Sequence, residues 1–217
     1  MIGKLEQKLI TTDRKKSVIG VDEVGRGCLA GPVYSACVSL NYHLLHDLDT
    51  KEKKLIRDSK SLSKKQREHA TSVIKSIATE WQIGIASVPE IEKWGIVPAT
   101  FKAAERAIKK CQQHYDILLY DGNTPLPFYH RPQLTIVKGD SSCYCIAAAS
   151  ILAKVARDHY MTKQSQQYPT YDFEKNAGYG TKTHLANLYA KGPCPLHRKN
   201  FAPVKNMSSV FFQKDSR

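Results

Sequence analysis

The feature that most constrains this chain is a short apolar run that ends in two adjacent acids. Val18-Ile19-Gly20-Val21 has the composition of a buried strand, and Asp22 and Glu23 follow it, just before Gly25-Arg26-Gly27. Carboxylates at the end of a buried strand are costly unless a cation or a hydrogen-bond donor meets them. The run therefore favours a sheet in which one strand end presents acidic groups to a cation.

The balance of charges indicates a polyanionic partner. The chain has 33 Lys and Arg against 20 Asp and Glu, a formal net charge of +13. Such an excess is typical of nucleic-acid-binding proteins, although charge alone also fits an ordinary basic protein. No apolar stretch is long enough to span a bilayer, and residues 1–16 lack the apolar core of a secretion signal. We expect a cytoplasmic protein that does not associate with membranes.

Six cysteines are present, but their spacing matches neither a zinc site nor a C-x-x-C pair. Several lie inside apolar runs, where cysteine behaves as a small hydrophobic residue. We expect reduced thiols rather than a disulfide framework, in keeping with a cytosolic protein.

Strand and helix signals alternate along the chain and indicate a layered α/β domain. Strands are expected at 17–24 and 33–40, joined by a glycine- and proline-rich turn, and a helix is expected after Ser63, whose capping-box partner is Gln66. The other expected elements are a loop or short helix at 41–54, a strand at 82–88, a helix that opens at Pro98 and Thr100, strands at 117–120 and 134–137, a helix at 142–163 and a short helix capped by Thr181. We expect one domain over residues 1–217, with a core at about 17–163 and a basic, helical C-terminal extension at about 164–217.

Acids fall at the ends of three of these strands. Asp22 and Glu23 end the first, Asp121 ends another and Asp140 follows a third. Strand ends that meet at one edge of a sheet are where α/β proteins place ligands. The acids would repel one another unless divalent cations neutralised them, and carboxylate oxygens suit Mg²⁺ or Mn²⁺. Two such ions about 4 Å apart can stabilise both oxygens that exchange at a phosphodiester.

Each acid also has a simpler interpretation. Asp121-Gly122-Asn123 is a good turn sequence, and Asp140 is favoured as a helix cap. Neighbours on a regular strand face opposite ways, so Asp22 and Glu23 should not share a site. A bulge, or the turn at Gly25, is expected to re-aim one of them.

Taken together, the motifs resemble the bacterial ribonuclease HII family, the type 2 ribonucleases H. The opening resembles that family through Gly20–Gly27 and Ala30–Val33. The resemblance continues through Asp58–Lys60, Leu62-Ser63, Tyr120–Asn123, Lys138–Asp140, Ile146–Asp158, Gly178–Thr181 and Pro195–Arg198, and it spans Ser17 to Val204. The sister family, ribonuclease HIII, has an extra N-terminal domain and usually a lysine in place of Arg26, so ribonuclease HII is favoured.

The resemblance implies a ribonuclease H-like fold, which is a mixed sheet of roughly five strands flanked by helices, with a helical C-terminal portion. It implies a catalytic metal site on Asp22, Glu23, Asp121 and Asp140, with two Mg²⁺ or Mn²⁺ ions in the substrate complex. The implied activity is cleavage of the RNA strand in RNA–DNA hybrids, and incision on the 5′ side of a single ribonucleotide embedded in duplex DNA. The products carry a 5′-phosphate and a 3′-hydroxyl.

The same resemblance assigns substrate contacts. The backbone of Gly25, Arg26 and Gly27 would approach the ribose 2′-hydroxyl, and Tyr179 would stack on the sugar of the next nucleotide. The expected phosphate contacts are Lys60, Lys138, Lys182 and Arg198. Taken singly, the glycines could form a structural hairpin, Tyr179 could lie in the core, and the basic residues could be solvated surface charges.

The expected partners are an RNA–DNA hybrid and ribonucleotide-containing duplex DNA, and the protein is expected to be a monomer. A sliding clamp is a further partner that the family resemblance raises. Phe211-Phe212 near the C-terminus is the candidate segment for binding it, and the favoured alternative is that these residues belong to a disordered apolar tail. The alternative function is a non-catalytic duplex-binding module, which leaves the strand-end acids without a purpose. A DNA-junction nuclease and a carboxylate-pair glycosidase also remain, although the basic charge counts against the glycosidase.

Overall fold

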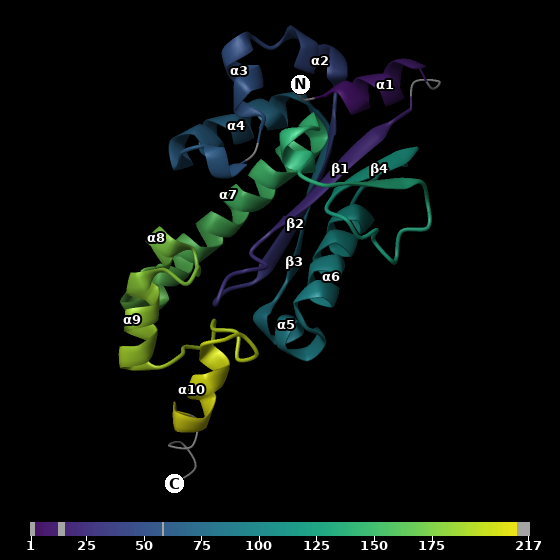
Figure 1. Cartoon of the computed structure of the whole chain (residues 1–217). Coiled ribbons are helices and arrows are strands. Elements are labelled where there is room, and N and C mark those ends of the chain that lie inside the picture. The colour runs from purple at the N-terminus through teal and green to yellow at the C-terminus, as the bar shows by residue number, and fades with distance from the viewer. Residues whose placement is uncertain (1–2, 13–15, 58, 212–217) are drawn as a thin grey trace. The chain divides into compact units, whose positions relative to one another are not determined.

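The computed structural model describes residues 3–12, 16–57 and 59–211, and its centre is a mixed five-stranded sheet (Figure 1). The strand order is β3-β2-β1-β4-β5. β1 pairs antiparallel with β2 and parallel with β4, and β4 pairs parallel with β5. The strands are β1 (Val18–Val24), β2 (Val33–Leu40), β3 (Ala78–Ala86), β4 (Ile117–Asp121) and β5 (Gln133–Ile136). The predicted mixed, roughly five-stranded α/β fold is confirmed.

The chain divides into two compact units. Unit 1 comprises Met1–Val24, Tyr34–Ile85 and Phe101–Val155. Unit 2 comprises Gly25–Val33, Ala86–Thr100 and Ala156–Arg217. The sequence predicted a core at about 17–163 and an extension at about 164–217. In the structure, two short segments from the first half of the chain, Gly25–Val33 and Ala86–Thr100, group with the C-terminal residues in unit 2. The first of these segments carries Gly25-Arg26-Gly27.

The helices within unit 1 follow local capping signals closely. They are α1 (Lys4–Thr12), α2 (Tyr42–Asp47), α3 (Thr50–Leu55), the 3-10 turns η1 (Ser59–Ser61) and η2 (Gly139–Ser141), and α4 (Lys64–Ile77). The predicted capping box is present: Gln66 N–H donates to Ser63 Oγ over 3.2 Å, and Ser63 N–H donates to Gln66 Oε1 over 2.9 Å. The ambiguous segment after β2 forms α2 and α3, each of which begins at a side chain that caps it, Asn41 and Asp49.

Two long helices, α6 (Ile96–Lys109) and α7 (Tyr144–Gln167), cover opposite faces of the sheet in unit 1. Ala104 and Ala107 of α6 pack in one core cluster with Ile19 and Val21 of β1. Gly20 lies between those two residues and faces the other way, where a Cβ would collide with the backbone at Cys145. The missing side chain therefore lets α7 lie directly against β1.

Unit 2 is mostly helical, as expected for the C-terminal portion. It contains α5 (Val88–Trp94), η3 (Pro169–Tyr171), α8 (Phe173–Asn176), α9 (Lys182–Lys191) and α10 (Val204–Phe211), together with the ends of α6 and α7. α9 begins at Thr181, whose Oγ1 accepts the His184 N–H, and ends at Gly192, which has a φ of 75°. The start at Thr181 was predicted from the sequence.

The structure differs from the sequence-based expectations at several places, and the strand expected at 82–88 begins at Ala78. Val88 was expected to continue a strand but starts α5, because Ser87 and Glu90 form a capping box ahead of it. The helix expected to open at Pro98 begins earlier, at Ile96. Helix α1 was not expected; its Glu6 is buried and accepts the backbone N–H groups of Tyr144 and Cys145 over 2.7 and 2.8 Å. None of the described helices is long and apolar enough to cross a membrane.

Candidate active site

The predicted acidic centre is built around Asp22, near the end of β1 in unit 1. Asp22 is 4% exposed, and its Oδ1 accepts the Glu23 N–H over 2.6 Å. Burial raises the pKa of Asp22 well above its ordinary value, and the charges of Glu23 and Asp121 raise it further. Hydrogen bonds from the Ser150 side chain and the Glu23 N–H act in the opposite direction but are weaker. Asp22, Glu23 and Asp121 therefore lie close enough to repel one another.

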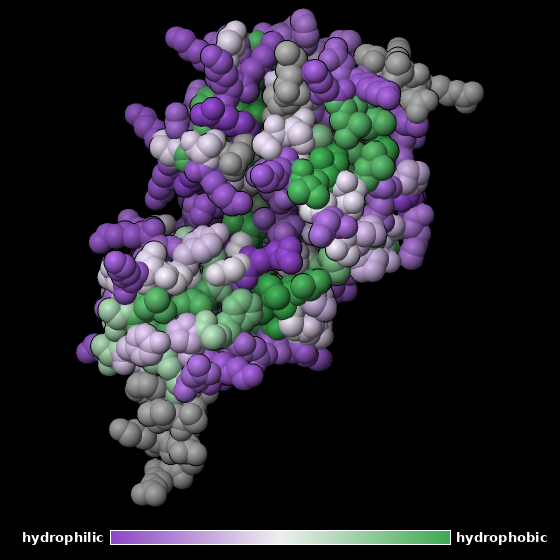
Figure 2. All heavy atoms as spheres, viewed as in Figure 1, coloured by the Kyte–Doolittle hydropathy of each residue, from purple (hydrophilic) through white to green (hydrophobic). Residues whose placement is uncertain are grey.

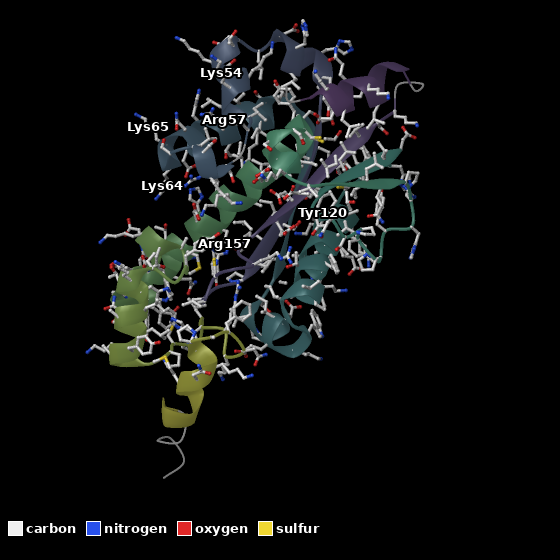
Figure 3. All side chains as sticks on the ribbon, in the orientation of Figure 1. Lys54, Arg57, Lys64, Lys65, Tyr120 and Arg157 are labelled. Carbon is white, nitrogen blue, oxygen red and sulfur yellow. The ribbon has the colours of Figure 1, made fainter. Side chains whose placement is uncertain are left out.

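Glu23 keeps its place beside Asp22 without the expected bulge. The β1–β2 register runs unbroken through Asp22↔Ala36, Glu23↔Ser35 and Val24↔Tyr34. The carboxylate of Glu23 is held from the neighbouring strand, where Tyr120 O–H donates to Oε2 over 3.0 Å. Tyr120, labelled in Figure 3, directly precedes Asp121 on β4. A tyrosine from β4, rather than an irregular backbone, therefore orients Glu23.

Asp121 is bonded to the backbone of the short turn after β5 that carries Asp140. Asp121 Oδ1 accepts the Gly139 N–H over 2.7 Å, and Gly139 is the first residue of η2, in which Asp140 follows it. Lys138, the residue before this turn, has a φ of 56° and caps η2. This bond fixes the turn that carries Asp140 against the end of β4. All four predicted acids thus lie in unit 1 and on connected elements.

No group of three or more His, Cys, Asp or Glu side chains in the described part of the chain is arranged to hold a metal ion. The chemistry of the acidic centre nonetheless fits a divalent cation. Its side-chain donors are carboxylate oxygens, the hard ligands that Mg²⁺ and Mn²⁺ prefer. Burial, and then the charges of Glu23 and Asp121, raise the pKa of Asp22. A bound cation would remove that repulsion.

Two serines that were not singled out from the sequence connect the acidic centre to η1. Ser150 of α7 hydrogen-bonds Asp22, and its Oγ lies 3.0 Å from Ser59 Oγ. Both serines are buried, at 7% and 4% exposure. The signal was available, since Ser59 and Ser150 lie inside the family-like segments 58–60 and 146–158, but a buried hydroxyl pair has no local sequence signature. Through this pair, η1 is positioned by the residue that bonds Asp22.

In unit 2, two buried arginines hold the loop that carries Gly25-Arg26-Gly27. Arg157 donates to the carbonyl oxygens of Ala30, Pro32 and Ala177 over 2.8–3.0 Å. Arg198 donates to the carbonyl oxygens of Gly25, Arg26 and Gly31 over 2.6–2.9 Å. Both side chains are 0% exposed. The two guanidinium groups thus turn the carbonyl oxygens of the loop inward.

The role of Arg198 differs from the one predicted. It was expected to contact phosphate, but its side chain is buried and its donors are occupied by the loop. Burial lowers its pKa to about 10, and the charge of Arg157 also lowers it. Arg157, labelled in Figure 3, was missed because it lies in a helical stretch that reads as surface. Gly25 has a φ of 98°, and a Cβ there would collide with Arg157.

Tyr179 lies in the loop between α8 and α9 and is 37% exposed, so it is not a core residue. Burial, and then the neighbouring Cys28 thiol, raise the pKa of Tyr179 to about 12. Its backbone is held on both sides: its N–H donates to Asn176 O over 2.9 Å, and its carbonyl oxygen lies 2.8 Å from His184 Nδ1. His184 Nε2 in turn lies 3.0 Å from His197 Nε2.

The remaining predicted substrate residues are exposed. In unit 1 these are Lys60 in η1 and Lys138 before η2. In unit 2 they are Arg26 and Gly27 in the loop and Lys182, the first residue of α9. Of the predicted clamp segment, Phe211 ends α10, and Phe212 lies outside the described residues.

Comparison with known proteins identifies the family. The sequence model described as Ribonuclease HII matches residues 19–204. The ribonuclease HII of Trichodesmium erythraeum is 46% identical over 86% of this chain and 87% of its own length. The ribonuclease HII of Idiomarina loihiensis is 46% identical over 88% of this chain and 97% of its own length. The chain belongs to the ribonuclease HII family and is therefore a ribonuclease H endonuclease.

Solved structures show the same fold at lower sequence identity. The ribonuclease H2 from Pyrococcus horikoshii superposes with a TM-score of 0.74 at 20% identity, over 91% of this chain and 99% of that chain. The ribonuclease HII in the PCNA complex from Archaeoglobus fulgidus gives a TM-score of 0.68 at 22% identity, over 85% of this chain and 95% of that chain. The predicted ribonuclease H-like fold, and the choice of ribonuclease HII over HIII, are confirmed.

Proposed function

We propose that this endonuclease cuts on the 5′ side of ribonucleotides, both in RNA–DNA hybrids and at single ribonucleotides within duplex DNA, with divalent cations held by Asp22, Glu23, Asp121 and Asp140. The observation that carries the proposal is the buried Asp22 carboxylate, whose pKa is raised by burial and by two neighbouring acids. The acids of this cluster would repel the phosphates of a nucleic acid as well as one another. A bound divalent cation would neutralise both repulsions.

Each residue of the centre has a defined task. A divalent cation bound there supplies charge neutralisation at the scissile phosphate and lowers the pKa of water. Tyr120 orients Glu23 through its hydroxyl, and Ser150 orients Asp22. Gly139 fixes Asp121 by donating its backbone N–H to the carboxylate. The same bond sets the position of Asp140, the residue that follows Gly139. No side chain needs to act as a covalent nucleophile.

Recognition of the ribose falls to unit 2 in this proposal. Because Arg157 and Arg198 draw the loop carbonyl oxygens inward, the exposed side of Gly25-Arg26-Gly27 is not dominated by oxygens that repel a polyanion. A Cβ on Gly27 would meet no protein atom within 4 Å, so space is available there for a ligand. Tyr179 has a protonated phenol and is partly exposed, which suits contact with a sugar and its hydroxyl.

The test uses three labelled duplexes of one sequence: all DNA, DNA with a single ribonucleotide, and an RNA–DNA hybrid. We expect no cleavage of the all-DNA duplex, and cleavage of the other two only when Mg²⁺ or Mn²⁺ is present. Mapping of the products should place the cut on the 5′ side of the ribonucleotide, with a 3′-hydroxyl upstream. Metal-dependent cleavage of the hybrid but not of the single-ribonucleotide duplex would restrict the activity to long hybrids. Equal cleavage of the all-DNA duplex would contradict the proposal.

Binding of a sliding clamp, a monomeric state and a cytoplasmic location stay predictions from the sequence. The A. fulgidus relative was solved in a complex with PCNA. A clamp-binding role for this chain would be tested by removing residues 208–217 and measuring binding to the clamp of the same cell. Binding unchanged by the truncation would exclude Phe211-Phe212 as the clamp-binding segment.

A further inference from the structure

The segment from α3 to the start of α4 concentrates positive charge on its exposed side. Residues 51–65 contain seven Lys and Arg against two acids, Glu52 and Asp58. Four of the cations are exposed and have no side-chain partner among the described residues: Lys54, Arg57, Lys64 and Lys65. Figure 3 shows these four side chains around α3 and the N-terminal turn of α4, and Figure 2 shows a hydrophilic surface over the same elements. We call them the α3–α4 cations.

The segment that carries the α3–α4 cations is anchored rather than loose. Ile56 and Leu62 are buried at 0% and 3% exposure, and Ser59 bonds the Ser150 hydroxyl. Arg67 donates to the carbonyl oxygens of Ser59 and Leu62, so it serves as an internal brace. The apolar side of the segment therefore faces the core of unit 1, and the cations are left on the outer side in a fixed arrangement.

Local stability does not explain this arrangement. Lys64 and Lys65 are the first two residues of α4, directly after the Ser63 cap. Cations at a helix N-terminus meet the positive end of the helix dipole, where acids are preferred, and neighbouring cations repel one another. The segment thus keeps an unfavourable charge pattern in the free protein, and an anionic ligand would relieve it.

The route from this segment to the acidic centre is short in bonds. Ser59 lies between Arg57 and Lys64 in the chain, and it bonds Ser150, which bonds Asp22. We propose that the α3–α4 cations bind the phosphate backbone of the substrate duplex away from the scissile phosphate, and so hold the nucleic acid over the acidic centre. This proposal rests on the proposed function for the identity of the substrate. It extends the contact surface beyond Lys60, the one residue of this segment predicted to contact phosphate.

The test measures binding without cleavage. Fluorescence anisotropy with a labelled 30-base-pair RNA–DNA hybrid, in a chelator, is recorded over a series of salt concentrations. The variant combines Lys54→Gln, Arg57→Gln, Lys64→Gln and Lys65→Gln. The control combines Lys4→Gln, Lys8→Gln, Lys191→Gln and Lys205→Gln, which removes the same charge from exposed positions elsewhere.

We expect the variant to bind about tenfold or more weakly near 0.1 M salt, and the slope of log K against log salt to fall by about 3 to 4 relative to wild type. The control should lose less than half of that slope. Equal slopes for the variant and the control would overturn the proposal. Because this assay measures binding and not cleavage, its result can be interpreted even if the wild-type protein does not cleave the hybrid. If the wild type is inactive but the salt slope still falls in the variant, the α3–α4 cations stand as a binding surface and only the proposed nuclease activity fails.

A second inference rests on a separate observation, the pair of buried imidazoles in unit 2. His184 and His197 are 0% and 1% exposed. A carbonyl oxygen can only accept, so the 2.8 Å contact with Tyr179 O places a proton on His184 Nδ1. His197 Nδ1 accepts the Cys194 N–H over 3.0 Å, so its own proton lies on Nε2 and is donated to His184 Nε2 over 3.0 Å. Each group thus donates to the next, from the Cys194 N–H through His197 and His184 to the Tyr179 carbonyl oxygen.

We infer that His184 is a positioning residue for Tyr179, and that His197 fixes the tautomer this role requires. Tyr179 O already accepts the Thr181 N–H over 2.8 Å, so the imidazole completes the bonds that fix the Tyr179 backbone. Arg198, the residue after His197, donates to the carbonyl oxygens of Gly25 and Gly31. His197 and Arg198 therefore act on the two loops proposed to recognise the ribose, the loop of Tyr179 and the loop of Gly25. This inference rests on the proposed contact of Tyr179 with the sugar.

The test compares kcat and KM on the single-ribonucleotide duplex and on the long hybrid. His184→Leu removes the donor, whereas His184→Asn keeps an N–H in the Nδ1 position and should rescue the activity. Tyr171→Phe is the control, because it loses a buried hydrogen bond, 2.7 Å to Gly192 O, in the same core. We expect His184→Leu to lower kcat/KM about tenfold on the single-ribonucleotide duplex and less on the hybrid, with His184→Asn close to wild type.

Equal losses on both substrates, or the same loss in Tyr171→Phe, would overturn the positioning role. Tyr179→Ala is measured alongside. If Tyr179→Ala has no effect on either substrate, the proposed sugar contact itself fails. If Tyr179→Ala lowers activity and His184→Leu does not, the contact stands and the positioning role is wrong.

Discussion

The acidic centre of unit 1 and the arginine-braced loop of unit 2 both contain buried charge, but they compensate it differently. Asp22 is surrounded by few donors and by two further acids, which raise its pKa. Arg157 and Arg198 carry equal burial, yet their donors meet six backbone carbonyl groups. The arginine charges, met by backbone carbonyl groups, hold the scaffold together, whereas the Asp22 carboxylate, beside two further acids, is placed to bind a cation.

The largest expected effect is on the acidic centre. Asp22→Asn should lower cleavage of the hybrid by about 10³-fold or more, because one ligand of the proposed metal site is lost. In metal-free buffer at pH 7 the same variant should melt a few degrees higher than wild type, since a buried, repelled carboxylate has been replaced by a neutral group. Thermal melting and a cleavage assay measure the two effects.

The sign of the pH dependence provides the check on that variant. Because the folded-state pKa of Asp22 is raised, the wild type should gain stability as the pH falls through that pKa, and its deficit relative to Asp22→Asn should vanish in acid. A variant that is inactive but less stable than wild type at pH 7 would show that Asp22 is compensated internally, like the arginines.

The second prediction concerns the loop of unit 2 that Arg157 and Arg198 hold. Arg198→Gln should lower the free energy of unfolding by about 3 kcal/mol, because buried carbonyl groups lose their donors. Arg26→Gln, in the loop that Arg198 holds, should change it by less than about 0.5 kcal/mol because that side chain is exposed. Urea unfolding of both variants measures the contrast, and similar values for the two would contradict the scaffold role.

The third prediction is that unit 2 responds to acid in the opposite way to the acidic centre. Burial, and then the charge of His184, lower the pKa of His197 from 6.5 to about 4. Its imidazole packs 4.8 Å from the Tyr171 ring and beside the Cys194 thiol, and a second proton, on Nδ1, would face the Cys194 N–H that this nitrogen now accepts. Stability should therefore be lost as the pH falls from about 6.5 to 4, by roughly 3 kcal/mol for His197 alone.

Urea unfolding at pH 7 and pH 5 checks this, with His197→Asn as the comparison. The variant should start less stable at pH 7 but lose less between the two pH values. If both proteins lose the same amount, another group titrates in this range and the two imidazoles are not held neutral by the fold.

The smallest expected effect separates the two glycines of the braced loop. A Cβ at Gly27 meets no protein atom within 4 Å, so Gly27→Ala should leave unfolding unchanged while raising KM for the single-ribonucleotide duplex about tenfold. Gly25→Ala should instead destabilise the protein, because Gly25 has a φ of 98° and faces Arg157. Unchanged kinetics for Gly27→Ala would remove this loop from ribose recognition.

Much of the local structure could be predicted from the sequence. The strand that ends in Asp22, the Ser63 capping box and the Thr181 cap of α9 follow from local patterns, and the structure has all of them. These features depend on residues that are close in the chain.

The parts that were missed depend on contacts between distant segments. Arg157 reads as a surface helix residue until the loop carbonyl oxygens of Ala30 and Pro32 are placed around it. Arg198 reads as a phosphate contact for the same reason. Tyr120 and Ser150 orient the acids across strands and helices, and a single hydroxyl carries no periodic signal. The family resemblance identified these segments without indicating which side chains face inward.

Calorimetric titration of Mn²⁺ into the protein bound to a non-cleavable DNA duplex shows whether the acidic centre binds metal. Wild type should bind Mn²⁺, and Asp22→Asn should bind at least about tenfold more weakly because it lacks one carboxylate of the centre. Asp116→Asn is the matched control, since Asp116 already accepts the Ser17 N–H and O–H over 2.8 and 2.9 Å. Equal Mn²⁺ affinity in wild type and Asp22→Asn would contradict the account that the acids at the ends of β1 and β4 form the metal site.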